Sequence, residues 1–504
     1  MLEMTPNPVT TTRRPAAGCA LDNVRTSRRG SATSEMQRPA AGQCPPSVFR
    51  AHFAVFLWAC PHRDVECSRQ RRCDRDRFRR RVQAFIGGRF PFHSLTPGGV
   101  PVPNVNPRIF AEPKTELRRR ADGAPPLSPA EPPAPGDPDL ARPLYRWARR
   151  RPAAVLAAER RGPGWEELTY GQALACAESL GQALLERGLG PDRPLVVLSG
   201  NSLRHLLLTL AGYIAGIPVA SLSTAYSLAG GHDRLRTVTG IARPGAVYAE
   251  DGHEYGAALE ALRELAPLTV LGHGRDPGRP SGGVRFGELL QAVPDERLAA
   301  ARARVRSGSV AKIMFTGGPA GRPKAVPNTH RMLCAVQRMM RQVWPLPSER
   351  PITLVDWLPW SHTFGGNHNL HMVLTTGGTL HIDDGGPTPE LFPRSIRNLA
   401  DVSPNVHFNV PAGFALLADE LERDSALAKC VFDRLSLLFS AGAPLSGELR
   451  RRLLALAARF ARREVRLTSS WGLMDGYLEA AGGRHAHPGS AGARRLRDYP
   501  RAAP

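Results

Sequence analysis

Long apolar runs are missing from this chain of 504 residues, and their absence argues against a membrane-spanning helix. The longest apolar candidate in the N-terminal region, Phe53 to Cys60, is far shorter than the roughly 18 residues that such a helix needs. The first twenty residues also lack the apolar core of a secretory signal peptide. The sequence therefore predicts a cytoplasmic protein with no membrane partner.

Cysteine is scarce, with eight residues in the chain, five of them within the first 73. The gaps between Cys60, Cys67 and Cys73 fit no zinc module, since the paired ligands of structural zinc sites usually lie about two to four residues apart. The cysteines thus predict no zinc site.

Lysine is scarce as well, because it supplies only four of the 67 basic residues and arginine supplies the rest. The formal net charge of +22 would favour nucleic acid or an anionic membrane as a partner if it covered the folded body. Residues 1–100 account for +10 of this charge and residues 446–504 for +7. This distribution, with the arginine bias that a GC-rich coding sequence produces, favours compositional drift over a selected basic surface.

The first 105 residues differ from the rest of the chain. Residues 1–105 are rich in Arg, Pro and Ser without a sustained helical or strand period, so they are predicted to be a low-order segment. Eight arginines lie between Arg69 and Arg81, where a solvated charge run is a simpler explanation than a nucleic-acid arm. Seven prolines within residues 124–138 predict an extended linker, and a globular body starts near residue 140.

From residue 140 onward, predicted helices and strands alternate. A helix is predicted from Tyr170 to Arg187, because apolar residues recur at helical spacing after Thr169 and Gly188 follows. Leu195–Leu198 is typical of a strand buried on both faces. The alternation predicts an α/β fold with mostly parallel sheets flanked by helices, which binds ligands at the carboxyl ends of its strands. Further strands are predicted at Ala246–Ala249, Leu268–Leu271, Val310–Phe315, Thr353–Trp357, Val406–Val410 and Leu435–Phe439, and further helices at Ser202–Ala215 and Tyr255–Leu265.

A glycine-rich loop follows the predicted strand Val310–Phe315. It runs from Thr316 to Ala325 and contains three glycines, which let the backbone turn tightly and present N–H groups to an anion. Lys324 adds a positive charge in a chain with only four lysines. The loop lacks the Gly-Lys-Ser/Thr ending of a Walker A motif. It predicts a phosphate-binding loop of another kind.

This loop resembles the phosphate loop of adenylate-forming (AMP-dependent) synthetases and ligases. Downstream segments are similar to the feruloyl-CoA synthases within that superfamily, and the resemblance spans roughly residues 106–474. The matching blocks are Leu198–Ser202, Ala225–Leu228, Leu354–Asn369, Gly377–Gly385, Val406–Phe414, Phe439–Leu445 and Ser470–Leu473.

The resemblance implies the large N-terminal domain of an acyl-CoA synthetase and a two-step reaction. A carboxylate attacks the α-phosphorus of MgATP to give acyl-AMP and diphosphate, and the thiol of coenzyme A then displaces AMP. ATP and Mg²⁺ are the implied cofactors, coenzyme A the co-substrate, and a small aromatic carboxylate the partner. The subfamily implies a role in phenylpropanoid degradation. Whether the chain forms a homodimer is left open.

The resemblance implies a role for each residue of this chain that matches a functional position of the family. His362 would be a gate or wall of the acyl site, and Lys324 the second catalytic group, with a structural histidine as the less favoured alternative for His362. Thr316 and Asp475 would assist the metal. Phe408 and Phe414 could instead belong to the core. The nucleotide-binding candidates are Thr316, Gly318, Gly321, Lys324, Ala441, Gly442, Ala443, Trp471 and Gly472, and the acyl-pocket candidates are His362, His407, Phe408, Val410 and Phe414.

Three hydroxyl residues of the family's phosphate loop are replaced by Gly317, Pro319 and Ala320. Pro319 also removes a backbone donor, and each lost contact would weaken phosphate binding by about 1–3 kcal/mol if buried. Asp475 stands where the family has a glutamate, one methylene longer.

Past Asp475 the resemblance stops. We therefore expect residues 106–474 to form an AMP-binding large domain, and residues 475–504 to be a disordered foreign tail. We also expect the C-terminal lid domain to be absent and the ligase activity to be impaired. Two alternatives remain: a non-catalytic protein that keeps a nucleotide or aromatic-acid pocket, and a basic nucleic-acid-binding protein that acts through its termini.

Overall fold

The computed structural model of the chain describes most residues between 109 and 470. They belong to one compact unit. The predicted low-order segment 1–105 and the predicted tail 475–504 lie outside this description. The described ranges are 109–111, 115–117, 127–129, 131–132, 134–228, 230–276, 283–316, 323–346 and 350–470.

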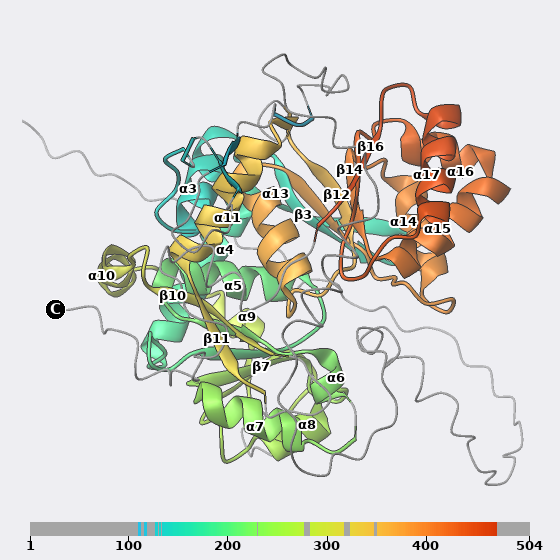
Figure 1. The fold of residues 1–504 in the computed structure, drawn as a ribbon. Helices are drawn as coiled ribbons and strands as arrows, with labels where there is room; N and C mark the ends of the chain where they lie inside the picture. The colour runs from blue at the N-terminus through green and yellow to red at the C-terminus, as the bar shows by residue number, and fades with distance from the viewer. Residues whose placement is uncertain are drawn as a thin grey trace, which may run out of the picture. The chain divides into compact units, whose positions relative to one another are not determined.

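The largest of the described sheets has seven strands (Figure 1). Its order is β11-β10-β6-β5-β7-β8-β9, and all neighbours are parallel except β10 and β11. The predicted α/β class is therefore confirmed. The strands are β5 (Leu195–Leu198), β6 (Val219–Ser221), β7 (Ala246–Asp251), β8 (Thr269–His273), β9 (Val284–Arg285), β10 (Val310–Phe315) and β11 (Ala325–Thr329).

Two further sheets have four and three strands. The four-stranded sheet has the order β12-β13-β3-β4, and the three-stranded parallel sheet has the order β14-β15-β16. Asn405 joins them, because its Oδ1 accepts from the Thr353 N–H at 2.9 Å and its own N–H donates to the Thr353 carbonyl at 3.2 Å. The strands are β3 (Val155–Arg161), β4 (Gly164–Thr169), β12 (Thr353–Asp356), β13 (Thr379–Ile382), β14 (Val406–Asn409), β15 (Leu437–Ser440) and β16 (Arg466–Ser469).

A small hairpin of β1 (Thr115–Leu117) and β2 (Leu127–Pro129) lies partly inside the predicted proline-rich linker. Leu127–Pro129 of the predicted extended linker thus pairs with a partner strand.

Helices cover the sheets. They are α3 (Ala141–Arg150), α4 (Tyr170–Glu186), α5 (Leu203–Ala215), α6 (Thr224–Ser227), α7 (Asp233–Ala242), α8 (Gly256–Ala261), α9 (Phe286–Leu289), α10 (Glu296–Arg304), α11 (His330–Val343), the π-helix η2 (Thr363–Asn369), α13 (Leu370–Thr376), α14 (Phe392–Asp401), α15 (Pro411–Arg423), α16 (Ser425–Phe432) and α17 (Gly447–Phe460). In the part of the chain that is described, none of them is both long and apolar enough to cross a bilayer.

Local signals explain where the helices begin and end. Thr169 caps α4 with a capping box, in which its Oγ1 accepts from the Gln172 N–H and the Gln172 Oε1 accepts from the Thr169 N–H. Ser202 caps α5, and Gly216 ends it in the left-handed region at φ 69°. Both predicted helices are confirmed to within about a residue at each end.

Two hydrophobic cores are filled by buried helices and by strand side chains that point alternately to the two faces of a sheet. All residues of α5 are buried, as expected for a helix covered on every side. It shares one core with α4 and with strands of both larger sheets. In the three-stranded sheet, Phe408 and Phe439 face that core, while Leu438 faces a second core under α14 to α17. Two cores therefore meet at β14 and β15.

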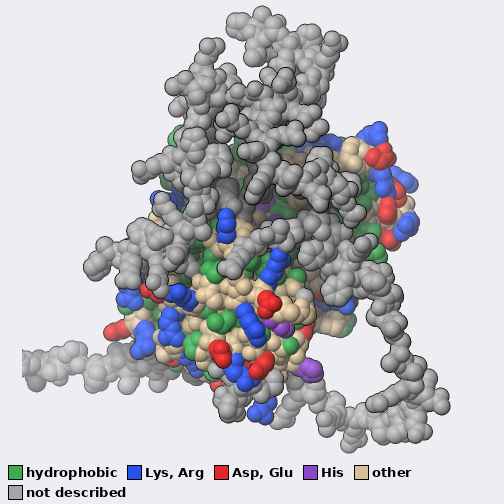
Figure 2. Space-filling model, turned by 60° about the horizontal axis from the view of Figure 1, so that its bottom comes forward, with side chains coloured by type: hydrophobic (Ala, Val, Ile, Leu, Met, Phe, Trp, Pro, Cys, Tyr) green, Lys and Arg blue, Asp and Glu red, His purple; other side chains and the backbone are tan. Residues whose placement is uncertain are grey.

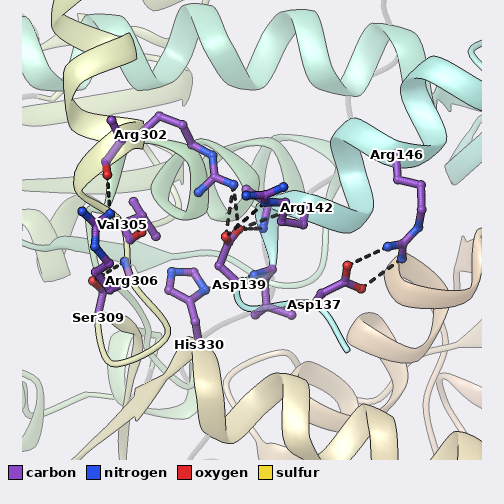
Figure 3. A network of polar contacts seen from close by, with 12 residues as sticks. Asp137, Asp139, Arg142, Arg146, Arg302, Val305, Arg306, Ser309 and His330 are labelled. Carbon is purple, nitrogen blue, oxygen red and sulfur yellow. Dashed lines mark hydrogen bonds and ion pairs between the residues drawn. The ribbon is translucent and has the colours of Figure 1, made fainter. Parts of the chain in front are cut away.

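Asp139 anchors the start of the globular body (Figure 3). Its carboxylate is almost fully buried and accepts two hydrogen bonds from Arg302 of α10, at 2.9 and 3.1 Å. It also accepts from the Ala141 and Arg142 N–H groups, which would otherwise be unpaired at the start of α3. The Leu140 N–H donates to His330 Nδ1 at 3.2 Å. The Asp139 carboxylate thus ties the start of α3 to α10, and the neighbouring Leu140 N–H ties it to His330 at the start of α11.

Basic side chains on the described surface are interleaved with acidic ones. In the face of the molecule shown in Figure 2, Lys and Arg side chains lie among Asp and Glu side chains. On α17, Arg452 pairs with Asp419 at 2.6 Å and with Glu422 at 2.8 Å. The described body shows no separate basic face in this view.

Candidate functional site

The base of the glycine-rich loop is closed by a reciprocal pair of hydrogen bonds. The Thr316 N–H donates to the Lys324 carbonyl at 3.0 Å, and the Lys324 N–H donates to Thr316 Oγ1 at 3.0 Å. The loop therefore starts and ends at one point, beyond the antiparallel pair β10 and β11. Lys324 is exposed. The predicted phosphate ligands Gly318 and Gly321 lie outside the described residues.

The segment that leads to His362 is fixed from two sides. Asn201, between β5 and α5, accepts from the Trp360 N–H at 3.0 Å and donates to the Leu358 carbonyl at 2.9 Å. Lys312 of β10 donates to the Trp360 carbonyl at 3.2 Å. His362 then caps η2 with its side chain, and burial lowers its pKa. The segment that precedes the predicted gate residue is thus tied to the seven-stranded sheet through Trp360, and burial favours the neutral form of the His362 imidazole.

Lys312 is an unusual residue for a sheet interior, because only 1% of it is exposed. Burial lowers its pKa to about 7, and its charge helps to depress the pKa values of His205 and His371. A Cβ on Gly366 would collide with both Lys312 Nζ and the Trp360 carbonyl. Glycine at position 366 is therefore required for η2 to lie on Lys312.

Helix η2 is also fixed to the strands that flank the loop. Asn367 Nδ2 donates to Asn328 Oδ1 of β11 at 2.6 Å and contacts the Met314 sulfur of β10 at 3.3 Å. Gln337 of α11 donates to the carbonyl groups of Asn367 and His368 at 3.0 and 3.2 Å. These bonds attach η2 to β10, β11 and α11.

The predicted adenine-binding residues follow β15. The Ala441 N–H donates to the Asn409 carbonyl of β14 at 3.3 Å, which brings the carboxyl ends of two strands together. Gly442 has a φ of +89°, and a Cβ there would come within 3.4 Å of Val410 Cγ1. Ala443 is exposed. Small side chains thus leave the backbone uncovered at this edge.

Trp471, Gly472 and Asp475, which were predicted to hold nucleotide and metal, lie outside the described residues. Their roles stay predictions.

An aromatic cluster lies between η2 and the three-stranded sheet. His368 stacks on Phe439 with ring centroids 5.3 Å apart and an interplanar angle of 25°. Phe408, Phe364 and Trp344 present their edges or faces to the same imidazole at 5.2, 5.7 and 5.9 Å. Of these five residues, only Phe408 was among the predicted acyl-pocket residues. The rings pack edge to face or stacked against one another, and Phe364, Phe408 and Phe439 belong to the buried core.

The other predicted acyl-pocket residues lie differently. Phe414 is fully buried in the core under α14 to α17, and His407 packs edge-on against it at 5.7 Å. Burial lowers the pKa of His407 to about 4, and its Nδ1 has no hydrogen-bond partner in the described part of the chain. Val410 is half-buried beside Gly442 at the end of β14. Of these candidates on β14 and α15, Phe408 lies in the aromatic cluster and Val410 lies beside Gly442, whereas Phe414 and His407 pack against each other.

A short polar chain runs behind the aromatic cluster. His368 Nδ1 lies 2.7 Å from Asn369 Oδ1, and Asn369 Nδ2 donates to Asp356 Oδ2 at 2.9 Å. Burial raises the pKa of Asp356 to about 7 and lowers that of His368 to about 4. All three residues are buried. The imidazole is therefore neutral near pH 7, and its orientation is fixed.

Sequence reasoning missed this polar chain, although a signal was present. His368 and Asn369 close the long segment that resembles feruloyl-CoA synthases, and Asp356 lies near its start. Two amides beside a histidine in an otherwise apolar helix indicate a buried polar contact. The partner of that contact depends on β12 lying beside η2, which the sequence does not reveal.

Metal ligands are sparse at the described site. Among the residues that the structure describes, no group of three or more His, Cys, Asp or Glu side chains lies close enough to hold a metal ion. A magnesium ion bound here would be coordinated chiefly by nucleotide phosphates and water, as is usual for Mg²⁺.

Comparison with known proteins agrees with this geometry. A family model described as AMP-binding enzyme matches residues 144–481. The long-chain-fatty-acid–CoA ligase heimdall of Drosophila melanogaster is 24% identical over 276 residues, which cover 53% of this chain and 39% of that protein. The salicylyl-CoA synthase/salicylate adenylyltransferase of a Streptomyces species is 29% identical over 232 residues, which cover 44% and 39%. The chain spans about two fifths of the length of these relatives.

Solved structures share the fold. The benzoate CoA ligase from Burkholderia xenovorans LB400 superposes with a TM-score of 0.53 at 18% identity, covering 67% of this chain and 62% of that one. At this identity the likeness concerns the fold alone, and it supports the predicted α/β large domain. Because the family model covers two thirds of the sequence, the chain belongs to the AMP-binding enzyme family, with acyl-CoA ligases among its relatives.

Proposed function

We propose that this chain binds MgATP and an aromatic carboxylate and forms an acyl-adenylate, as part of an aryl-CoA ligase of the feruloyl-CoA synthase type. One observation carries the proposal. The loop base at Thr316 and Lys324, the His362 segment and the aromatic cluster are all attached to β10 or to η2. The predicted phosphate-binding loop and the buried aromatic cluster are thus attached to the same elements.

The proposed chemistry joins the carboxylate to AMP. A carboxylate oxygen forms a bond to the α-phosphorus of ATP, and the bond to the bridging oxygen of diphosphate breaks, so that diphosphate leaves with its electron pair. Lys324 and the backbone N–H groups of the loop would stabilise the negative charge on the phosphates. Neutral His362 would exclude water from the reacting carboxylate without adding a competing charge.

The substrate class follows from the aromatic cluster and from the sequence resemblance. Four aromatic rings around a neutral imidazole favour a flat, conjugated acid over a flexible acyl chain. We propose a hydroxylated cinnamic acid, such as 4-coumarate, caffeate or ferulate. Coenzyme A would accept the acyl group in the second step.

We also propose that the adenylation rate is low, because Gly317, Pro319 and Ala320 replace family hydroxyl residues in the loop. A non-catalytic protein with the same two pockets is the second candidate, and it rests on this same replacement. In the described body, the pairing of arginines such as Arg452 with carboxylates gives no support to a nucleic-acid-binding surface.

The experiment is acid-dependent exchange of labelled diphosphate into ATP, combined with calorimetric titration of ATP and of 4-coumarate. We expect binding of both ligands and slow exchange that requires the acid. The double variant G317S/A320T restores loop hydroxyls and should raise the exchange rate about tenfold. Binding without exchange in both proteins would favour the non-catalytic candidate. Absence of binding would refute the proposal.

A further inference from the structure

An open cavity of about 380 Å³ lies between the start of α3 and the end of α10. Its volume falls within the range of about 300–1,000 Å³ that is usual for small-molecule sites. Among the described residues that line it, three are arginines and one is an acid, namely Arg142, Arg302, Arg306 and Asp139. The lining thus carries two more positive than negative charges, and this excess favours an anionic ligand.

The carboxylate of Asp139 is already engaged within the protein (Figure 3). Its two oxygens accept hydrogen bonds from Arg302 Nη2 at 2.9 and 3.1 Å. Its Oδ1 also accepts from the N–H groups of Ala141 and Arg142. The Nε of Arg142 lies 4.0 Å from the carboxylate, and 64% of the Arg142 side chain is exposed. Asp139 therefore balances Arg302 and leaves most of the Arg142 charge available to a ligand.

The guanidinium groups of Arg302 and Arg306 are held in place, yet both keep free donors. Arg302 bonds to Asp139 through Nη2 alone, and its Cζ lies 5.7 Å from the centre of the Tyr145 ring. Arg306 Nη1 donates to the carbonyl groups of Ala303 and Val305. In the part of the chain that the structure describes, the Nε and the second terminal nitrogen of each arginine have no hydrogen-bond partner. Fixed guanidiniums with unpaired N–H groups are suited to phosphate oxygens.

This cavity is separate from the glycine-rich loop. Arg306 precedes β10 and His330 follows β11, and the His330 N–H donates to the Ser309 carbonyl at 3.1 Å. These residues therefore lie at the open end of the antiparallel pair β10 and β11. Thr316 and Lys324, which close the glycine-rich loop, lie at its other end.

We propose that the cavity between α3 and α10 binds a phosphate monoester, at a site distinct from that of the proposed ligase reaction. Arg142, Arg302 and Arg306 would bind the phosphate oxygens, and the ring of Tyr145 would contact the organic group. A phosphate dianion matches the excess of two positive charges better than a carboxylate, which carries a single charge. Inorganic phosphate shares this chemistry, so it is compared with the ester in the test.

The first test compares the two ligands. Phenyl phosphate and inorganic phosphate are titrated calorimetrically into the full chain at pH 8, where both are mainly dianions. We expect phenyl phosphate to bind at least about threefold more tightly, because its ring can contact Tyr145. Equal affinities would assign the site to the free anion and overturn the preference for an ester.

The second test locates the bound phosphate. Arg142→Gln and Arg306→Gln each remove one guanidinium from an exposed side chain, and each should weaken binding of phenyl phosphate about tenfold. Arg452→Gln makes the same charge change at exposed ion pairs on α17 and should leave binding unchanged. Lys324→Gln changes the glycine-rich loop and should also leave binding at this cavity unchanged. Urea unfolding checks that each variant is folded.

Each outcome decides for or against the site. Weakening confined to Arg142→Gln and Arg306→Gln would support the proposal. No binding of phenyl phosphate by the unmodified chain, or equal weakening by Arg452→Gln, would overturn it. Loss of binding in Lys324→Gln alone would place the phosphate at the glycine-rich loop and overturn it as well. None of these measurements requires ATP or an acid substrate, so their result is independent of the proposed ligase function.

Discussion

Lys312 Nζ donates a hydrogen bond at 3.2 Å to the carbonyl oxygen of Trp360, two residues before His362. A buried amine of the central sheet thus holds the segment that carries the predicted gate residue. The bond also explains why glycine is required at position 366, where a side chain would displace the amine.

Lys312 should make the protein more stable as the pH rises. Its pKa is about 7 in the fold and about 10.4 in an unfolded chain, so between these values the unfolded state binds a proton that the folded state lacks. Stability should therefore increase by about 2 kcal/mol between pH 7 and 9 from this residue alone. Lys312→Met should abolish that increase, as measured by urea unfolding at the two pH values. An equal increase in both proteins would contradict the assignment.

His407 should contribute to acid sensitivity. Burial lowers its pKa to about 4, below the ordinary value near 6.5, so the unfolded chain binds more protons between these pH values. Its contribution is complete above pH 6.5 and is lost as the pH falls toward 4. His407→Leu should reduce the loss of stability over this interval by roughly 3 kcal/mol. Thermal unfolding of both proteins from pH 7 to 4 measures the difference, and parallel curves would refute it.

Thr316 should matter for nucleotide binding through its hydroxyl. Thr316→Val removes the acceptor for the Lys324 N–H at the loop base, while Thr316→Ser keeps it. We expect Thr316→Val to weaken ATP binding by about 1 kcal/mol, or roughly fivefold, and Thr316→Ser to bind nearly as the unmodified chain does. Calorimetric titration with MgATP measures both. Equal weakening by the two substitutions would show that the hydroxyl is not the cause.

Asp139 should be important for stability rather than for the reaction. Asp139→Ala leaves the side chain of Arg302 without its buried carboxylate and exposes two N–H groups of α3, at a cost of about 3 kcal/mol. Glu422→Gln, on an exposed pair with Arg452, is the control and should cost less than about 1 kcal/mol. Urea unfolding compares them. A similar loss of unfolding free energy in the two variants would show that the buried Asp139 contacts stabilise the fold no more than an exposed ion pair does.

Much of the fold could be predicted because its elements carry local signals. The strand Val310–Phe315 has the predicted bounds, since an apolar run ends at a glycine-rich loop. The helix predicted from Tyr255 to Leu265 is shorter, because α8 ends at Ala261 and turns fill the rest before Pro267. Apolar spacing continues through those turns, so periodicity alone could not find the end of the helix.

The site was predictable in part. Thr316 and Lys324 are neighbours across a loop, and a motif reveals such a pair. His368, Asn369 and Asp356 come together because the end of β12 reaches the C-terminal end of η2, where Asn369 donates to Asp356. That contact depends on tertiary structure and has no signature in sequence spacing. Phe414 repeats the aromatic character of Phe408, but it lies in the other core.

The central claim, adenylation of an aromatic acid, is tested most directly by isotope transfer. 4-Coumarate labelled with ¹⁸O in its carboxylate is incubated with the full chain, MgATP and coenzyme A, and the AMP formed is analysed by mass spectrometry. Attack of the carboxylate on the α-phosphorus predicts one ¹⁸O atom in the AMP. AMP without the label, or no AMP above a control without acid, would contradict the account.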